Sequence, residues 1–149
     1  MATSSNSKLS MGTVLSLYWF LFWILNGFDK FFNADTFFGA NFKVGLENNF
    51  LPALGLSTSL AWPIAIIVGI IELLLGLMFL MALIRFWGGN DGRYDTARTA
   101  ITLSVLFFAL LSAGAILFGA RDPMWQHGTF IATLLLTQHA LHVAAKSDA

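Results

Sequence analysis

The stretch that decides the fold is WPIAIIVGIIELLLGLMFLMALIRFW, residues 62–87. From Trp62 to Phe86 it is almost entirely apolar, and about 20 such residues in a helix suffice to cross the hydrocarbon core of a bilayer. A helix from Trp62 to Trp87 would be about 37 Å long, so it has to tilt within a core of about 30 Å or project from it. The two tryptophans mark the levels expected for the two membrane–water interfaces. The sequence therefore predicts a transmembrane helix here.

The composition of the whole chain agrees with a membrane protein. Of 149 residues, 57% are hydrophobic and only 11% are charged, which is too little charge to cover the surface of a soluble domain. The formal net charge is zero, so nothing indicates nucleic acid as a partner. The sequence has no cysteine, which excludes disulfides, thiol nucleophiles and cysteine-ligated iron–sulfur clusters. Electron transfer would therefore need a partner protein or a bound small molecule.

Three other apolar stretches have the length of a membrane span. With the first one, they give predicted spans at residues 11–32, 62–86, 98–119 and 124–144. A glycine-rich turn, Gly88–Arg93, separates the second span from the third. Asp122 and Pro123 are suited to cap and begin the fourth. One long and two short connections favour an all-α membrane protein, a four-transmembrane-helix up-down bundle in a single domain over residues 1–149.

The long connection between the first two spans carries a helical pattern of its own. Apolar residues recur every four positions while charged residues fall on another side: Phe38, Phe42, Leu46 and Phe50 against Asp35, Lys43 and Glu47. This period predicts an amphipathic surface helix in the headgroup layer, which Pro52 should end. The alternative is an irregular loop whose phenylalanines pack on the bundle.

The distribution of basic residues predicts the orientation in the membrane. Five flank the predicted spans on the side of the termini and three on the other side: Lys8, Arg85, Arg93, Arg98 and Lys146 against Lys30, Lys43 and Arg121. Because cytoplasmic loops carry more lysine and arginine, this excess favours cytoplasmic termini.

Glu72 is the first candidate functional residue. It lies near the centre of the second span, where an ionised group costs several kcal/mol unless it is paired or neutralised. Gly69 and Gly76 share its helix face, and small residues there let a neighbouring helix approach, which points Glu72 into the bundle. We expect Gly69 and Gly76 to serve helix packing. Glu72 is either a carboxyl that handles protons or binds a ligand, or a structural hydrogen-bonding group.

The outer end of the first span supplies the second candidate. Its polar residues follow a helical spacing and form one stripe: Asn26, Asp29, Lys30 and Asn33. A pocket between the first two spans would then combine this stripe with Glu72. Such a pocket would suit a quinone headgroup or another small polar molecule without specifying one. The alternative is ordinary solvation of a helix end, where Lys30 reaches toward water.

The histidines do not form a recognisable metal or haem site. His127 begins the fourth span, while His139 and His142 lie near its other end. One chain therefore cannot offer two facing axial haem ligands, and no carboxylate is clearly placed to complete a metal site with His139 and His142. We predict no metal site, no covalently bound cofactor and no catalytic residue of the chain's own.

The motifs around the candidate residues resemble a known family. The first predicted span ends in Gly27-Phe28-Asp29-Lys30-Phe31, and the second contains Gly69-Ile70-Ile71-Glu72, followed by Gly76. With the long outer loop and the spacing of the spans, these stretches are similar to the DoxX-like family of small four-helix membrane proteins, in which Gly-x-x-Lys and Gly-x-x-Glu patterns stand at those positions. The resemblance covers almost the whole chain. The chain departs from the family pattern at two places: its outer loop is longer and rich in phenylalanine, and its fourth span has no matching signature.

The resemblance implies a multi-pass protein of the inner (plasma) membrane that is linked to redox proteins. Some relatives resemble subunits of thiosulfate:quinone oxidoreductase. We therefore predict an accessory or anchoring subunit of a quinone-linked redox complex, which would reduce quinone only with a partner that carries the electron-transfer centre. Its expected partners are the lipid bilayer and other membrane or membrane-attached redox subunits. Two alternatives are a purely structural subunit of a respiratory or photosynthetic assembly, and a small proton-coupled transporter or lipid-handling protein that uses Glu72.

Overall fold

The computed structural model describes residues 10–32, 42–117 and 123–147. Four long helices dominate it: α1 (Met11–Phe32), α4 (Ala61–Trp87), α5 (Arg93–Leu117) and α6 (Met124–Ser147). Between α1 and α4 lie four short helical pieces: α2 (Phe42–Gly45), the π-helical η1 (Leu46–Phe50), α3 (Leu51–Ala53) and the 3₁₀ turn η2 (Thr58–Leu60). These described residues contain no strand, which confirms the predicted all-helical class.

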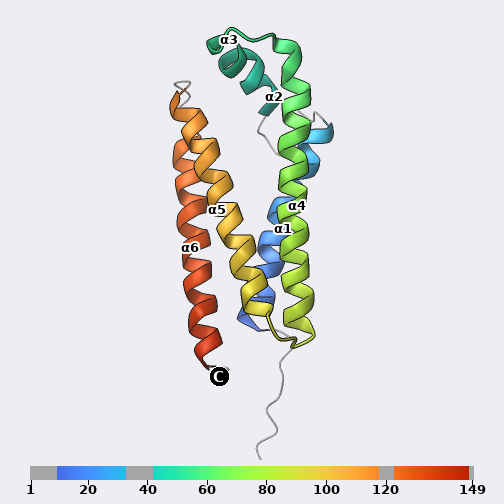
Figure 1. The fold of residues 1–149 in the computed structure, drawn as a ribbon, viewed down its shortest axis with the longest axis vertical. Coiled ribbons are helices and arrows are strands. Elements are labelled where there is room, and N and C mark those ends of the chain that lie inside the picture. Colours follow the sequence, from blue (N-terminus) through green and yellow to red (C-terminus); the bar gives the residue numbers. More distant parts are fainter. Residues whose placement is uncertain (1–9, 33–41, 118–122, 148–149) are drawn as a thin grey trace, which may run out of the picture.

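The four long helices lie side by side (Figure 1). α1 packs along α4, α4 also contacts α5, α5 pairs with α6, and α6 returns to contact α1. The turn between α4 and α5 uses Gly89 and Gly92, with φ angles of 65° and 76°, a conformation that only glycine adopts without strain. The start of α1, this turn and the end of α6 share the lower end of the molecule in Figure 1, and α2 and α3 lie at the upper end.

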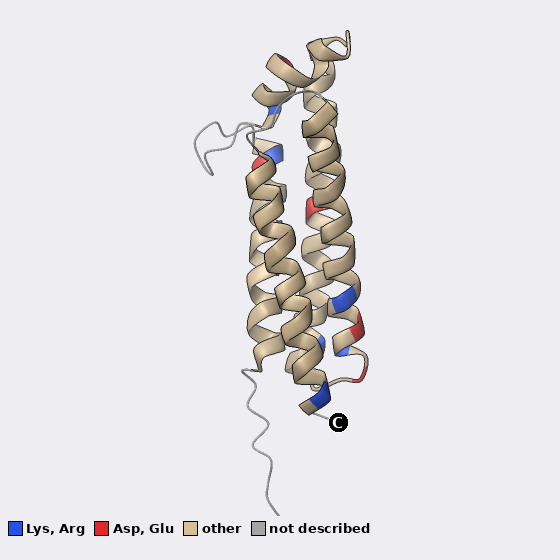
Figure 2. Ribbon diagram, turned by 90° about the vertical axis from the view of Figure 1, so that its left-hand side faces the viewer, with Lys and Arg blue, Asp and Glu red and all other residues tan. Residues whose placement is uncertain are grey.

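Three helical stretches of the described chain have the length and the hydropathy to cross a membrane: Met11–Phe32, Thr58–Trp87 and Arg93–Leu117. Charged residues gather toward the two ends of the long helices, with few between them (Figure 2). α6 has 24 residues but is not one of the three, and polar residues such as Gln138 and His139 dilute its apolar character. The structure thus agrees with a membrane protein, and the fourth span stays a prediction.

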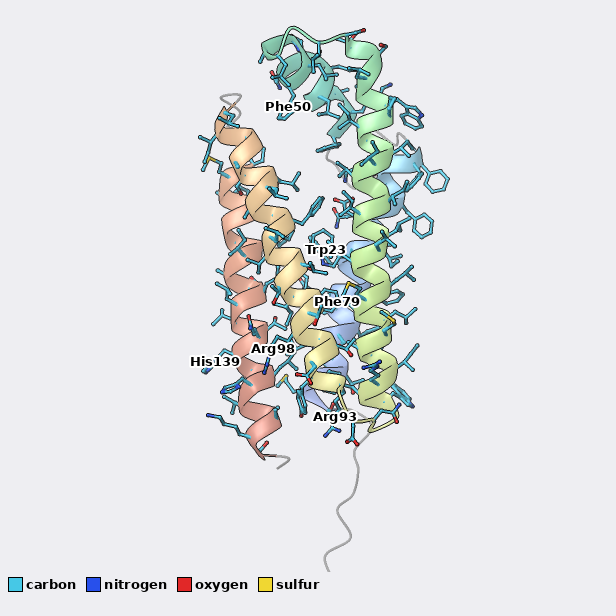
Figure 3. The ribbon with its side chains drawn as sticks, viewed as in Figure 1. Trp23, Phe50, Phe79, Arg93, Arg98 and His139 are labelled. Atoms are coloured by element: carbon cyan, nitrogen blue, oxygen red, sulfur yellow. The ribbon has the colours of Figure 1, made fainter. Side chains whose placement is uncertain are left out.

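Aromatic residues fill the space at the centre of the long helices (Figure 3). Trp19 and Trp23 of α1 are 0% and 1% exposed. The ring of Trp19 stacks on Phe79 of α4 with centroids 6.2 Å apart, and the ring of Trp23 lies 5.0 Å from that of Phe108 in α5. The indole Nε1 of Trp19 donates a hydrogen bond of 3.1 Å to Oγ1 of Thr137 in α6. These contacts tie α1 to each of the other long helices.

Thr137→Val should lower the free energy of unfolding by about 1 kcal/mol, because the buried indole N–H of Trp19 then loses its acceptor. Unfolding in mixed micelles, followed by tryptophan fluorescence, would measure the change. Thr133→Val is the matched control: the hydroxyls of Thr133 and Thr137 both donate to the carbonyl four residues earlier, but only Thr137 also accepts from Trp19. Equal effects of the two changes would show that the bond between α1 and α6 contributes nothing measurable.

The connection between α1 and α4 is helical from Phe42 to Ala53, in three consecutive pieces. The described part thus favours the predicted helix over an irregular loop, although Asp35 and Phe38 lie outside the described residues. Leu46 and Leu51 are buried, and Lys43 forms an ion pair of 3.5 Å with Glu47. The π-helical piece begins directly after Gly45 and contains Asn48 and Asn49, residue types of low helix propensity. From Phe42 onward the predicted segment is therefore helical, but it is not one regular helix.

Candidate functional site

Glycine residues bring α1 and α4 into close contact at the level of the candidate site. A Cβ atom added to Gly69 would lie 2.9 Å from Cβ of Lys30 and 3.1 Å from the backbone oxygen of Gly27. One added to Gly76 would lie 3.2 Å from the backbone nitrogen of Ile24. Because no larger residue fits without displacing the partner helix, these glycines fix how closely and in which register α1 and α4 pack.

This packing places Lys30 of α1 beside Glu72 of α4. The Nζ atom of Lys30 is 3.4 Å from Oε2 of Glu72, and the two side chains are only 9% and 7% exposed. Lys30 Nζ also donates to the backbone oxygen of Asn26 at 3.4 Å and lies 5.3 Å from the ring centroid of Phe42 in α2. Lys30 therefore turns inward to its carboxylate partner. Ordinary solvation of a helix end would instead require Lys30 to extend to water.

Asp29 is a second buried acid in this region. It is 9% exposed and lies close enough to Glu72 for the two charges to interact. Among the described residues, the cluster thus combines two carboxyl groups with one ammonium group, that of Lys30. One cation cannot neutralise two ionised carboxylates, so a bound proton or a hydrogen-bond donor from a ligand would stabilise the cluster.

Two atoms of this cluster, Oδ1 of Asp29 and Oε2 of Glu72, have no hydrogen-bond partner within the described residues, and neither has the buried Nε1 of Trp23 in α1. The contact of Oε2 with Lys30 is thus an ion pair without good hydrogen-bond geometry. Ile24 faces Gly76 and Gly27 faces Leu73 in this antiparallel pair, so Trp23 lies about 7.5 Å from the level of Glu72 along the helix axis. Buried polar atoms normally find partners. The two carboxyl oxygens are acceptors that the hydrogen-bond donors of a small ligand would satisfy.

The other residues of the predicted stripe have different positions. The side-chain amide of Asn26 donates to the backbone oxygen of Phe22 at 2.8 Å, so Asn26 meets Lys30 through its own backbone oxygen only. Asn33 lies outside the described residues. Of the stripe, the structure thus brings Lys30 to Glu72 in direct contact and Asp29 near it.

Sequence reasoning did not identify Trp23 and Phe42 as members of this site. Trp23 packs against Phe107 and Phe108, and its N–H without a hydrogen-bond partner has no signal in the sequence. Phe42 was assigned to the apolar side of the surface helix, and its ring instead covers the ammonium group of Lys30. Both contacts depend on how separate helices meet, which no local pattern encodes.

The histidines lie away from this cluster of charges. Nδ1 of His127 is 3.2 Å from Oγ of Ser112 in α5, a contact that the sequence did not predict. His139 and His142 are exposed near the other end of α6. Among residues 10–32, 42–117 and 123–147, no group of three or more histidine, cysteine, aspartate or glutamate side chains could hold a metal ion.

Comparison with known proteins adds no relative. No family model, no curated protein and no solved structure matches the chain.

Proposed function

We propose that the chain crosses the membrane four times as an up-down bundle, with α6 as the fourth span. α6 is long enough and packs against α5 and α1. It turns large apolar side chains outward, with Leu135, Leu136 and Val143 between 51% and 69% exposed, as a lipid-facing helix does. The amphipathic segment of α2, η1 and α3 would lie at one interface.

The positions of the basic residues support one orientation of this bundle in the membrane. Arg85, Arg93, Arg98 and Lys146 lie toward the end that carries the start of α1 and the end of α6, while Lys30 and Lys43 lie toward the other end. By the excess of positive charge, the end with the termini is the cytoplasmic face of an inner membrane.

We further propose that the chain is a membrane subunit of a quinone-linked redox complex, with a quinone headgroup bound at Lys30 and Glu72. The observation that carries this proposal is a desolvated ion pair, together with carboxyl oxygens of Glu72 and Asp29 that have no hydrogen-bond partner among the described residues. Charged residues inside a membrane are costly and mark functional sites more often than structural ones. The paired residues are also the lysine and the glutamate of the two motifs that resemble the DoxX-like family.

The chemistry of the cluster suits a quinone. The two carbonyl oxygens of a quinone accept hydrogen bonds, and the ammonium group of Lys30 and the indole N–H of Trp23 can donate them. Reduction to quinol takes up two electrons and two protons. The electrons would come from a partner redox subunit, and the carboxyl groups of Glu72 and Asp29 would each pass one proton to the quinone oxygens. The chain's own contribution is to bind, orient and protonate.

Glu72→Gln should lower the affinity of the assembled protein for decylubiquinone about tenfold, since a charge-assisted contact that holds Lys30 in place is lost. The protein would be purified from its native membrane and titrated with decylubiquinone, and the quinone retained per chain would be measured by extraction and chromatography. Assembly and membrane insertion should not change.

Glu47→Gln is the matched control for this experiment. Glu47 also pairs with a lysine, Lys43, but the two side chains are 32% and 30% exposed and lie in the amphipathic segment. If Glu72→Gln and Glu47→Gln both retain as much decylubiquinone per chain as the unmodified chain, the proposed quinone site at Lys30 and Glu72 is wrong. The chain would then be better explained as a purely structural subunit.

A further inference from the structure

A hollow separates α5 and α6 near the end of the molecule that carries the start of α1 and the end of α6. Its lining residues are Tyr94, Arg98, Ile101, Gln138, Leu141 and His142. Its empty space, which includes space open to solvent, is about 210 Å³, and it has room for about one water molecule. One oxygen atom of a larger group could therefore enter the hollow while the rest of the group stays outside.

Apolar and polar residues divide the hollow into a floor and a rim. Ile101 and Leu141 are 0% and 5% exposed and form the floor. The remaining lining residues bring a phenol, a guanidinium, an amide and an imidazole, each of which can donate a hydrogen bond. This arrangement suits a compact group that accepts several hydrogen bonds.

The charge around the hollow favours an anion. The described residues at this end include four basic and two acidic side chains: Arg85, Arg93, Arg98 and Lys146 against Asp91 and Asp95. Nη1 of Arg98 is 3.9 Å from Oδ1 of Asp95, a long distance for an ion pair, and the two side chains are 54% and 81% exposed. Such an exposed pair is weak, so it leaves most of the guanidinium available to a ligand. Figure 3 shows Arg93 and Arg98 at this end.

We propose that this hollow binds the phosphate group of an anionic phospholipid. Arg98 lies five residues after the start of α5, about 7.5 Å along the helix axis, which is the depth of a headgroup at the end of a span. One turn from Gln138 toward the middle of α6, Leu135 is 51% exposed and offers apolar surface to an acyl chain. The phosphate meets the polar rim, and its glycerol and acyl parts continue along the seam between the two helices.

Arg98→Gln should lower the affinity for phosphatidylglycerol about tenfold, because a charge-assisted contact with the phosphate is lost. The full chain in mild detergent would be titrated with phosphatidylglycerol and with phosphatidylcholine, and bound lipid would be counted by native mass spectrometry. The unmodified chain should prefer phosphatidylglycerol, and Arg98→Gln should remove most of that preference.

Arg85→Gln is the matched control, with the same loss of charge at the same end of the molecule. Arg85 does not line the hollow; its Nη1 donates to Oγ1 of Thr96 at 2.7 Å, a bond that a glutamine amide can replace. Equal losses in Arg98→Gln and Arg85→Gln would overturn the proposal, since they would show general attraction to negative charge. Unchanged binding in Arg98→Gln would overturn it as well.

Glycerol 3-phosphate, a soluble form of the same headgroup chemistry, separates a lipid from a free phosphate compound. It should compete only weakly with phosphatidylglycerol, since it lacks the acyl chains that follow the helix seam. If it competes as well as the lipid and depends equally on Arg98, the hollow is a site for soluble phosphate compounds and the lipid proposal is wrong.

Discussion

Gly69→Leu should lower the free energy of unfolding by about 3 kcal/mol, the upper range for overpacking a tight interface. The new side chain has no room, because even its Cβ atom would lie 2.9 Å from both Lys30 and Phe31 and 3.1 Å from the backbone oxygen of Gly27. The ring of Phe31 can rotate away, but a backbone oxygen moves only if the whole of α1 shifts. Unfolding in mixed micelles, monitored by tryptophan fluorescence, would report the loss.

Gly128→Leu is the control for this change. Gly128 lies in α6, and no atom comes within 4 Å of a Cβ added there. Leucine has a higher helix propensity than glycine, so Gly128→Leu should leave stability unchanged or raise it by a few tenths of a kcal/mol. Similar losses for the two changes would show that the contact of α1 with α4 does not depend on the small residue at position 69.

The sequence allows the long helices to be predicted well because lipid imposes a simple rule. About 20 consecutive apolar residues must be helical to satisfy their backbone groups within a bilayer. The first and last residues of each helix are predicted less well by this rule. α5 begins at Arg93 and α6 ends at Ser147, beyond the predicted spans that begin at 98 and end at 144. Hydropathy reports the part of a helix within lipid, whereas polar residues can extend the same helix into water.

The candidate site could be predicted on one helix but not across two. On α4, Gly69 and Gly76 flank Glu72 at helical spacing, so a close neighbour on that face follows from the sequence alone. Which residue of α1 meets Glu72 depends on the register of two antiparallel helices. That register is fixed by contacts such as Gly27 against Leu73, and the sequence does not reveal it.

The polar stripe of α1 shows the same limit. Helical spacing places Asn26 and Lys30 on one side of α1, but it cannot distinguish a side chain that bonds to its own helix from one that reaches across. The amide of Asn26 bonds to Phe22, while the ammonium group of Lys30 reaches Glu72. The difference follows from length, because lysine can span the gap between the helices and asparagine cannot.

Lys30→Met should lower the free energy of unfolding by about 3 kcal/mol, since it leaves Glu72 buried without a counter-ion. Methionine keeps much of the length and apolar surface of lysine, so the loss reports the charge and not a cavity. The mixed-micelle unfolding assay would measure it. Lys43→Met, which breaks the half-exposed pair with Glu47, should cost less than about 1 kcal/mol.

The double change Lys30→Met with Glu72→Leu should recover most of the stability that Lys30→Met alone removes. Desolvating an ion pair costs nearly as much as the attraction between its charges returns, so a well-packed apolar pair can replace it without loss. If the double variant is as stable as the unmodified chain but no longer retains decylubiquinone, the pair is kept for binding and not for stability. If the double variant is as unstable as Lys30→Met, the ion pair itself holds α1 to α4. Its main role would then be structural, and the quinone proposal would lose the observation on which it depends.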